Sequence, residues 1–158
     1  MNLGITITST VLVLLVVTPV VLMQQQQKNK ERKLIKALRA FAELNNSSIT
    51  EYDVFKNFAI GLDKNKNNLF FYKNNASKEN SQCINLNEIK SCGVLNSKKP
   101  TKKNTLGDIS RLELVLNPVK NSIDKHTLEI YNETEDFQLN GELEFIRKWE
   151  HIINNSLT

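Results

Sequence analysis

The chain has 158 residues and a formal net charge of +4. That charge is unevenly distributed: residues 24–39 contain six basic residues and one acid, whereas residues 40–158 contain fifteen basic and sixteen acidic residues. The larger part of the chain is therefore nearly neutral, which argues against a nucleic-acid partner, and its length allows one ordinary domain.

The N-terminal stretch Leu3–Met23 contains no Asp, Glu, Lys or Arg. As an α-helix, which rises about 1.5 Å per residue, it would span roughly the 30 Å hydrocarbon core of a bilayer. A cleaved signal peptide would need a basic n-region and a small-x-small cleavage site, and we find neither in this stretch. We therefore expect a retained, single-pass transmembrane helix.

A group of basic residues follows this span, and no basic side chain precedes it. Because cytoplasmic flanks carry the excess of Lys and Arg, we expect the N-terminus outside and the C-terminal domain in the cytoplasm. The abundance of Asn and Lys is typical of an AT-rich bacterial genome, so the expected location is a bacterial inner membrane. We call these residues the basic cluster and expect them to face lipid: Lys28, Lys30, Arg32, Lys33, Lys36 and Arg39.

Good helix formers continue beyond the span through residues 24–46, with Leu34, Leu38 and Phe41 at helical spacing. The segment is predicted to be a basic, juxtamembrane amphipathic helix that continues the span. Its narrow apolar stripe has three alternatives: packing on the following domain, lying along the membrane, or pairing with a second copy as a short coiled coil. We favour packing on the domain.

Beyond residue 48 the pattern changes to short β-type runs, separated by segments rich in Asn, Lys, Ser and Gly. Several of these runs alternate apolar and polar residues, which is typical of half-buried antiparallel strands. Seven strands are predicted: Thr50–Phe55, Asn57–Asp63, Asn68–Lys73, Cys83–Leu86, Lys90–Leu95, Ile109–Leu116 and Thr127–Tyr131.

The chain closes with a predicted amphipathic helix. Asn140 is its expected N-cap, and Leu143, Ile146, Trp149 and Ile153 recur at intervals of three and four residues. One apolar face is therefore predicted. It carries the only Trp of the chain, which we expect to close one end of the sheet or barrel.

Seven short strands followed by one helix with a Trp resemble the pleckstrin-homology-like superfold, which includes the GRAM and bacterial PH modules. The resemblance covers residues 48–158 and rests on element order and on Trp149. It implies an α+β fold in which a bent, seven-stranded antiparallel sheet or barrel is capped by the C-terminal helix. PH modules that bind phosphoinositides carry basic residues around the loop between their first two strands. Here that connection holds one lysine, Lys56, so the resemblance does not imply headgroup recognition.

No catalytic, cofactor-binding or metal-binding motif is found in the sequence. The five glycines are scattered, so no phosphate-cradling loop is predicted, and Cys83 and Cys92 lack the C-x-x-C spacing of a metal site. We expect no enzymatic activity and no cofactor, and both cysteines to be reduced thiols. The one enzymatic alternative is a small thiol-dependent hydrolase built on either cysteine with His126.

Two functional hypotheses follow. The first is a cytoplasmic docking or scaffolding module for a protein partner, held at the membrane by the N-terminal helix. The second is a module that senses anionic lipid in the inner leaflet, using the basic cluster together with a basic loop. The loop contains four lysines: Lys98, Lys99, Lys102 and Lys103.

Overall fold

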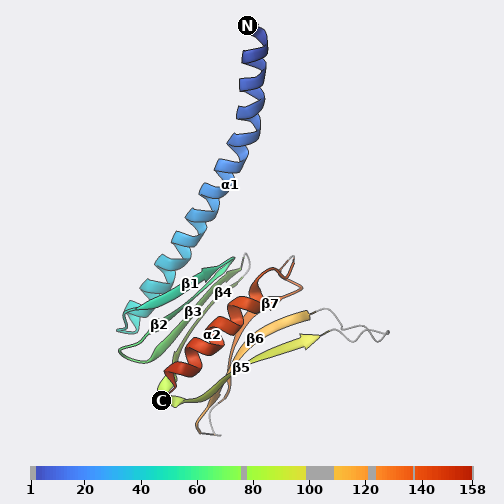
Figure 1. Cartoon of the computed structure of the whole chain (residues 1–158). Helices are drawn as coiled ribbons and strands as arrows, with labels where there is room; N and C mark the ends of the chain where they lie inside the picture. The colour runs from blue at the N-terminus through green and yellow to red at the C-terminus, as the bar shows by residue number, and fades with distance from the viewer. Residues whose placement is uncertain (1–2, 76–77, 99–108, 121–123, 137, 158) are drawn as a thin grey trace, which may run out of the picture.

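The structure, a computed structural model, describes residues 3–75, 78–98, 109–120, 124–136 and 138–157. In this part of the chain it contains a long N-terminal helix, two antiparallel sheets and a C-terminal helix (Figure 1). The fold class is therefore α+β, as the sequence predicts.

The N-terminal helix α1, Leu3–Leu44, is a single helix that continues through Pro19. Between Ile7 and Met23 every side chain is exposed, and by length and composition this part of α1 is a candidate membrane span. The following residues remain helical, and the last turns of α1 lie against the domain (Figure 1). The candidate span and the packed segment are therefore parts of one rigid element.

The seven strands form two sheets that do not continue into one another. The first sheet has the order β1-β2-β3-β4, from Glu51–Phe55, Phe58–Asp63, Asn68–Asn75 and Lys78–Asn85. The second has the order β5-β6-β7, from Ile89–Lys98, Ile109–Pro118 and His126–Asn132.

The expected single seven-stranded sheet is therefore wrong. A short 3₁₀ helix, Leu86–Glu88, separates β4 from β5, and the Asn85 side chain accepts a hydrogen bond from the Asn87 N–H at its start. This turn redirects the chain, so that β5 pairs with β6 and not with β4.

Several strands are longer than the sequence predicts. The strand β4 begins at Lys78 instead of Cys83, and β5 extends to Lys98 instead of Leu95. The added residues pair through their backbones with β3 and β6. Most of them are polar, so they gave no apolar signal from which the pairing could be predicted.

The four-stranded sheet is covered on both faces. On β2, Phe58, Ile60 and Leu62 belong to the core between the sheets, whereas Ala59 faces α1. The helix α1 covers the outer face of this sheet, so its apolar stripe packs on its own domain. The buried residues of this outer layer come from both elements: Leu34, Leu38 and Ala42 of α1 with Ala59, Phe70 and Tyr72 of the sheet.

Close packing of α1 requires a glycine on β2. A Cβ atom at Gly61 would lie 2.9 Å from Cγ2 of Ile49 and 3.1 Å from Cδ2 of Leu38. These separations are shorter than ordinary carbon–carbon contacts. The absence of a side chain at Gly61 therefore lets the helix approach the sheet.

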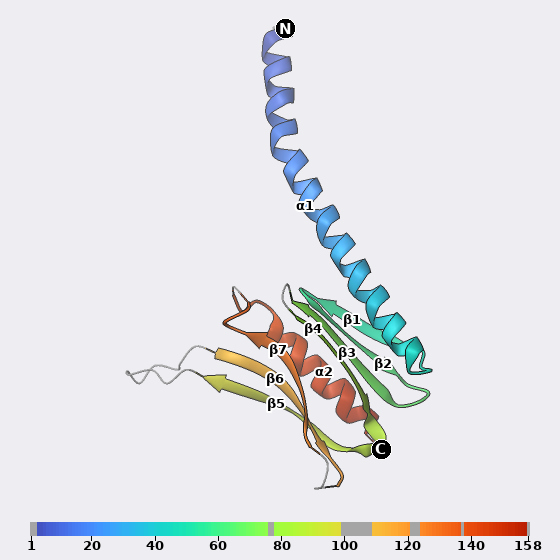
Figure 2. The same cartoon turned by 180° about the vertical axis from the view of Figure 1, so that it is seen from behind.

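The C-terminal helix α2, Glu142–Ser156, lies between the two sheets (Figure 2). It contacts both of them: Nε1 of Trp149 donates a 2.8 Å hydrogen bond to Asp53 of β1, and the Asn154 side chain pairs with the backbone N–H and C=O of Cys92 on β5, each at 2.9 Å. Trp149 is completely buried. The helix therefore fastens the two sheets together.

The predicted N-cap of α2 is wrong by one residue. The cap is Gly141, whose φ of 89° is in the left-handed region that glycine adopts at low cost. The Asn140 side chain does not cap the helix; its backbone N–H instead donates a hydrogen bond to the Glu142 carboxylate. The carboxylate of Glu142 thus turns back to the chain that precedes the helix.

Candidate functional site

The basic cluster lies on the part of α1 that joins the candidate span to the domain. All six side chains are exposed, and none forms an ion pair with a carboxylate in the described part of the chain. The guanidinium of Arg39 lies 5.3 Å from the centre of the Tyr52 ring, which is a cation–π contact.

The structure divides the basic cluster between two sides of the helix. Successive residues of an α-helix are rotated by about 100°, so Lys30 lies about 160° around the helix from Arg32, whereas Arg32, Lys36 and Arg39 lie within about 60° of one another. Lys30 and Lys33 turn toward one end of the four-stranded sheet, whereas Arg32, Lys36 and Arg39 line a separate surface groove of α1. The sequence had indicated one uniform group.

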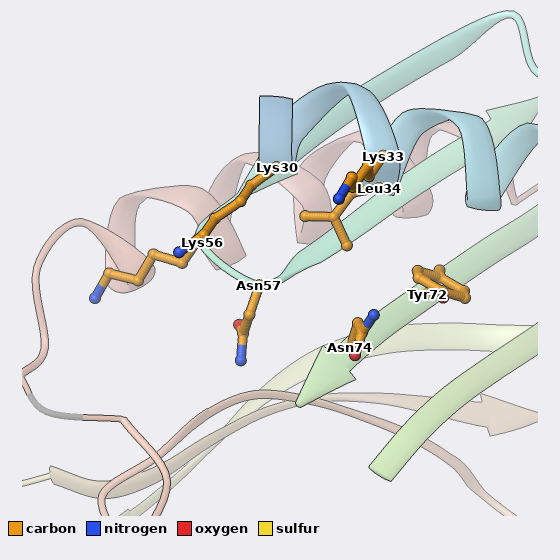
Figure 3. Close-up of a pocket in the computed structure, with 7 residues that line it drawn as sticks. All are labelled: Lys30, Lys33, Leu34, Lys56, Asn57, Tyr72 and Asn74. Carbon is orange, nitrogen blue, oxygen red and sulfur yellow. The ribbon is translucent and has the colours of Figure 1, made fainter. Parts of the chain in front are cut away.

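Lys30 and Lys33 line a cavity of about 470 Å³ between α1 and the sheet (Figure 3). We call it the cationic cavity, because it is lined by three lysines and no carboxylate. Its lining residues come from α1, from the β1–β2 turn and from β3: Lys30, Lys33, Leu34, Lys56, Asn57, Tyr72 and Asn74.

The β1–β2 turn supplies the third lysine in a strained conformation. Lys56 has a φ of 49°, in the left-handed region that usually favours Gly, Asn or Asp. Its ammonium group pairs with the carboxylate of Glu142, which is buried, and donates a 2.9 Å hydrogen bond to the Gln138 carbonyl. The charge of Lys56 is therefore already balanced.

The charges of Lys30 and Lys33 are not balanced. Neither ammonium group has a hydrogen-bond or ion-pair partner among the described residues. In Figure 3 the Lys30 side chain extends from α1 toward Lys56, and the Lys33 side chain lies beside Leu34. The cationic cavity thus has two uncompensated positive charges at its helix wall.

Its other wall is polar and held in place by hydrogen bonds. The Asn74 N–H donates a 2.9 Å bond to the Asn57 carbonyl, and the Asn57 side-chain amide donates to Asn75. Burial raises the pKa of Tyr72, and the nearby carboxylate of Glu79 raises it further. The Tyr72 hydroxyl therefore stays protonated at neutral pH, as a neutral donor and acceptor.

The predicted basic loop is mostly outside the described residues. Lys98 is the last residue of β5 and is exposed. Lys99, Lys102 and Lys103 lie outside the part of the chain that the structure describes.

The two cysteines lie in different environments. Cys92 is buried, and burial together with the charge of Glu150 raises the pKa of its thiol to about 12. Cys83 is exposed, and its pKa is also raised by partial desolvation. Neither thiol is activated as a thiolate nucleophile at neutral pH.

The sheet register separates Cys92 from His126. Both residues pair with Leu116 of β6, from its two opposite sides. Two strand spacings, about 10 Å, therefore lie between their backbones, which is beyond hydrogen-bond reach. In the described part of the chain, no group of three His, Cys, Asp or Glu side chains is arranged to hold a metal ion.

Sequence reasoning identified Lys30 and Lys33 but missed the rest of the cationic cavity. Asn57, Tyr72 and Asn74 look like ordinary strand and turn residues in the sequence, which gives no indication that they lie beside α1. One signal was available: β3 is apolar at successive positions, which indicates a strand covered on both faces.

Comparisons with protein families, with curated proteins and with solved structures find no match to this chain.

Proposed function

We propose that this chain is a single-pass membrane protein whose α+β domain lies on the cytoplasmic side and docks a protein partner at a fixed position relative to the bilayer. The observation that carries this proposal is the continuity of α1, which is apolar and exposed at one end and part of the domain core at the other. The basic cluster supports the orientation with the N-terminus outside.

The junction between the candidate span and the domain supports a fixed position of the domain relative to the bilayer. Met23 and Leu34 are separated by eleven residues of uninterrupted helix, about 16 Å, and Leu34 is already buried against the sheet. A flexible linker would let a domain rotate freely near the membrane. A rigid helix instead holds the domain in one orientation and at one distance from the bilayer.

The best candidate docking surface is the outer edge of β1, next to α1. Tyr52 on this outermost strand exposes 39% of its surface and lies against Arg39 of α1. Tyr and Arg are the side chains most enriched at protein interfaces, and an outer strand can accept a partner strand. The edge of β5 is less suitable, because its N–H groups at Cys92 and Val94 already donate to side chains of α2.

The orientation can be tested with one exposed thiol. In the full-length Cys92→Ala variant, Cys83 is the only cysteine and is exposed. A membrane-impermeant maleimide should label it only after cells are permeabilised, and the Cys83→Ala variant gives the background signal. Labelling of intact cells would overturn the cytoplasmic location.

Docking can be tested by photo-crosslinking in cells. A photoreactive amino acid at position 52 should give a discrete adduct, and the Arg39→Ala substitution should weaken it. The matched control is the same probe at position 95, since Leu95 is 50% exposed on the other sheet. No adduct at position 52, or the same adducts at both positions, would contradict docking at β1.

A second candidate function is contact with anionic lipid, favoured by six exposed basic residues on the part of α1 that follows the candidate span, none of which forms an ion pair within the described residues. Each such residue contributes about 1 kcal/mol of attraction near an anionic surface. In nanodiscs, replacing phosphatidylcholine with phosphatidylglycerol should slow amine acetylation of Lys28 and Lys36, and high salt should abolish this effect. Acetylation rates that do not depend on lipid charge would exclude this function.

A further inference from the structure

The cationic cavity lies at the end of the domain that faces the candidate span. Its turn residues belong to the β1–β2 connection, on the side toward which α1 leaves the domain (Figure 1). Lys30 and Lys33 follow Met23 by seven and ten residues, about 10 and 15 Å of helix. The polar headgroup layer extends about 5–8 Å beyond the hydrocarbon, and long basic side chains reach toward it. The backbone of Lys30 therefore lies a few ångström beyond the headgroup layer and that of Lys33 about one helical turn farther, so their ammonium groups can extend back toward the lipid phosphates.

The charges of the cavity select an anion. Glu142 balances Lys56, so Lys30 and Lys33 leave a net charge of about +2 at the wall. The amide groups of Asn57 and Asn74 add neutral hydrogen-bonding groups. A phosphate monoester matches this set, because it has a charge between −1.5 and −2 and three strong acceptor oxygens.

The turn wall is formed before any ligand binds. Lys56 keeps a left-handed backbone that costs roughly 1–2 kcal/mol in a residue other than glycine. Its ion pair with the buried Glu142 holds the turn in this conformation, and strain of this kind is commonly found at binding sites. The exposed side chains of Lys30, Lys33 and Asn74 have to be ordered on binding.

We propose that the cationic cavity binds the phosphate monoester of an anionic group, supplied by a lipid headgroup of the adjacent leaflet. Lys30 and Lys33 provide the charge, and Asn57 and Asn74 provide hydrogen bonds. This inference deepens the second candidate function, since it assigns lipid contact to one side of α1. It also rests on the membrane insertion of the proposed function, but not on protein docking at β1.

The first experiment measures lysine acetylation rates by mass spectrometry, on the full-length chain in nanodiscs. Phosphatidic acid should slow acetylation of Lys30 and Lys33 about fivefold at a concentration near four times its Kd, and that of Lys28 and Lys36 much less. Phosphatidylglycerol, whose phosphate diester has a single charge, should protect Lys30 and Lys33 less. Equal protection of all four lysines would overturn the cavity as a site.

The second experiment compares two double variants that lose the same charge. Capture of a photoactivatable phosphatidic acid should fall about tenfold further in Lys30→Ala/Lys33→Ala than in Lys28→Ala/Lys36→Ala, because the second pair loses only the general attraction of a basic residue to an anionic surface. All four side chains are exposed, so both variants should fold. Equal losses would support general lipid attraction and overturn the cavity. If none of the three chains captures the lipid, both general lipid attraction and the cavity as a lipid site are overturned.

The source of the phosphate is decided by a soluble probe. Inorganic phosphate, added to phosphatidylcholine nanodiscs at constant ionic strength, should protect Lys30 and Lys33 less than phosphatidic acid does. Equal protection would overturn lipid as the source and assign the site to a soluble phosphate ester. Labelling of Cys83 in intact cells tests the membrane orientation separately, so the failure of the two proposals can be distinguished.

Discussion

The two sheets differ in how many of their faces are covered. The four-stranded sheet has α1 on its outer face and the shared core on its inner face, so every residue of β2 is buried. Among the described residues, the three-stranded sheet has only its inner face covered, and β6 alternates between buried and partly exposed positions. An antiparallel sheet commonly has one solvated face, so the four-stranded sheet is the less usual of the two.

This difference shows that α1 is structurally part of the domain. The outer face of the four-stranded sheet has large apolar side chains, such as Phe70, whose ring packs edge-to-face on Phe41 of α1 at 5.9 Å. Without α1 these side chains would be in water. The same sequence segment that connects to the candidate span is therefore required for the domain core.

The largest expected effect comes from the outer face of the four-stranded sheet. Phe70→Ala should lower the free energy of unfolding by about 4 kcal/mol, because it opens a cavity beneath α1. Urea unfolding of the full-length chain in detergent, followed by Trp149 fluorescence, measures this. Leu95→Ala, on the solvated face of the other sheet, should change the free energy by less than about 0.5 kcal/mol. Similar values for both would contradict the difference between the sheets.

A second test uses α1 itself. Leu38 is completely buried, and Leu38→Ala should cost about 3 kcal/mol of unfolding free energy in the same assay. Leu44→Ala is the control, since this side chain on the same helix is 83% exposed and should contribute almost nothing. If the two substitutions have the same small effect, α1 is only a tether.

Asp63 holds the segment that follows α1 to the sheet, and a substitution of Asp63 tests this attachment. Burial raises the pKa of its carboxyl, but hydrogen bonds from the N–H groups of Ser48, Lys66 and Asn65 and from Ser47 outweigh this and lower it below the ordinary 3.8. Asp63→Asn should therefore cost about 2 kcal/mol at pH 7.

The same pKa shift predicts the pH dependence. Because the folded pKa lies below the unfolded one, the stabilisation is present above pH 3.8 and is lost as the pH falls through the folded pKa. The difference between the unmodified chain and Asp63→Asn should shrink in that range. A difference that stays constant from pH 7 to pH 2 would show that the charge is not involved.

The smallest expected effect concerns the contact between helix and sheet at Gly61. Gly61→Ala should cost about 1.5 kcal/mol, because the new methyl group meets Ile49 and Leu38. In an Ile49→Ala background the same substitution should cost about 1 kcal/mol less, which a double-mutant cycle measures. If the effects of Gly61→Ala and Ile49→Ala are additive, the helix does not approach the sheet closely at Gly61.

The sequence predicted the elements better than their arrangement. The apolar patterns identified all seven strands and the C-terminal helix, because burial of one face leaves a clear periodicity. They did not indicate that β4 and β5 separate into two sheets, since this depends on the hydrogen bonds of a short turn at Asn85. They also gave no reason to expect a buried lysine.

That lysine is Lys73, which is 3% exposed and donates a 3.2 Å hydrogen bond to Glu129 on the other sheet. The two residues are 56 positions apart in the sequence, so no local pattern connects them. The cationic cavity was unpredictable for the same reason. Lys30 and Lys33 were recognised as basic, but their position above Asn57 and Asn74 depends on how α1 crosses the sheet.

The crossing of α1 over the sheet also determines where the chain can be cut. The boundary between the candidate span and the domain lies within α1, near Lys28, and not after the helix at residue 46. A fragment that starts at residue 47 would leave Ala59, Phe70 and Tyr72 uncovered, and it would be prone to associate through this apolar surface. During synthesis, the part of α1 that covers the sheet leaves the ribosome before any strand, so the sheet assembles on a helix that is already made.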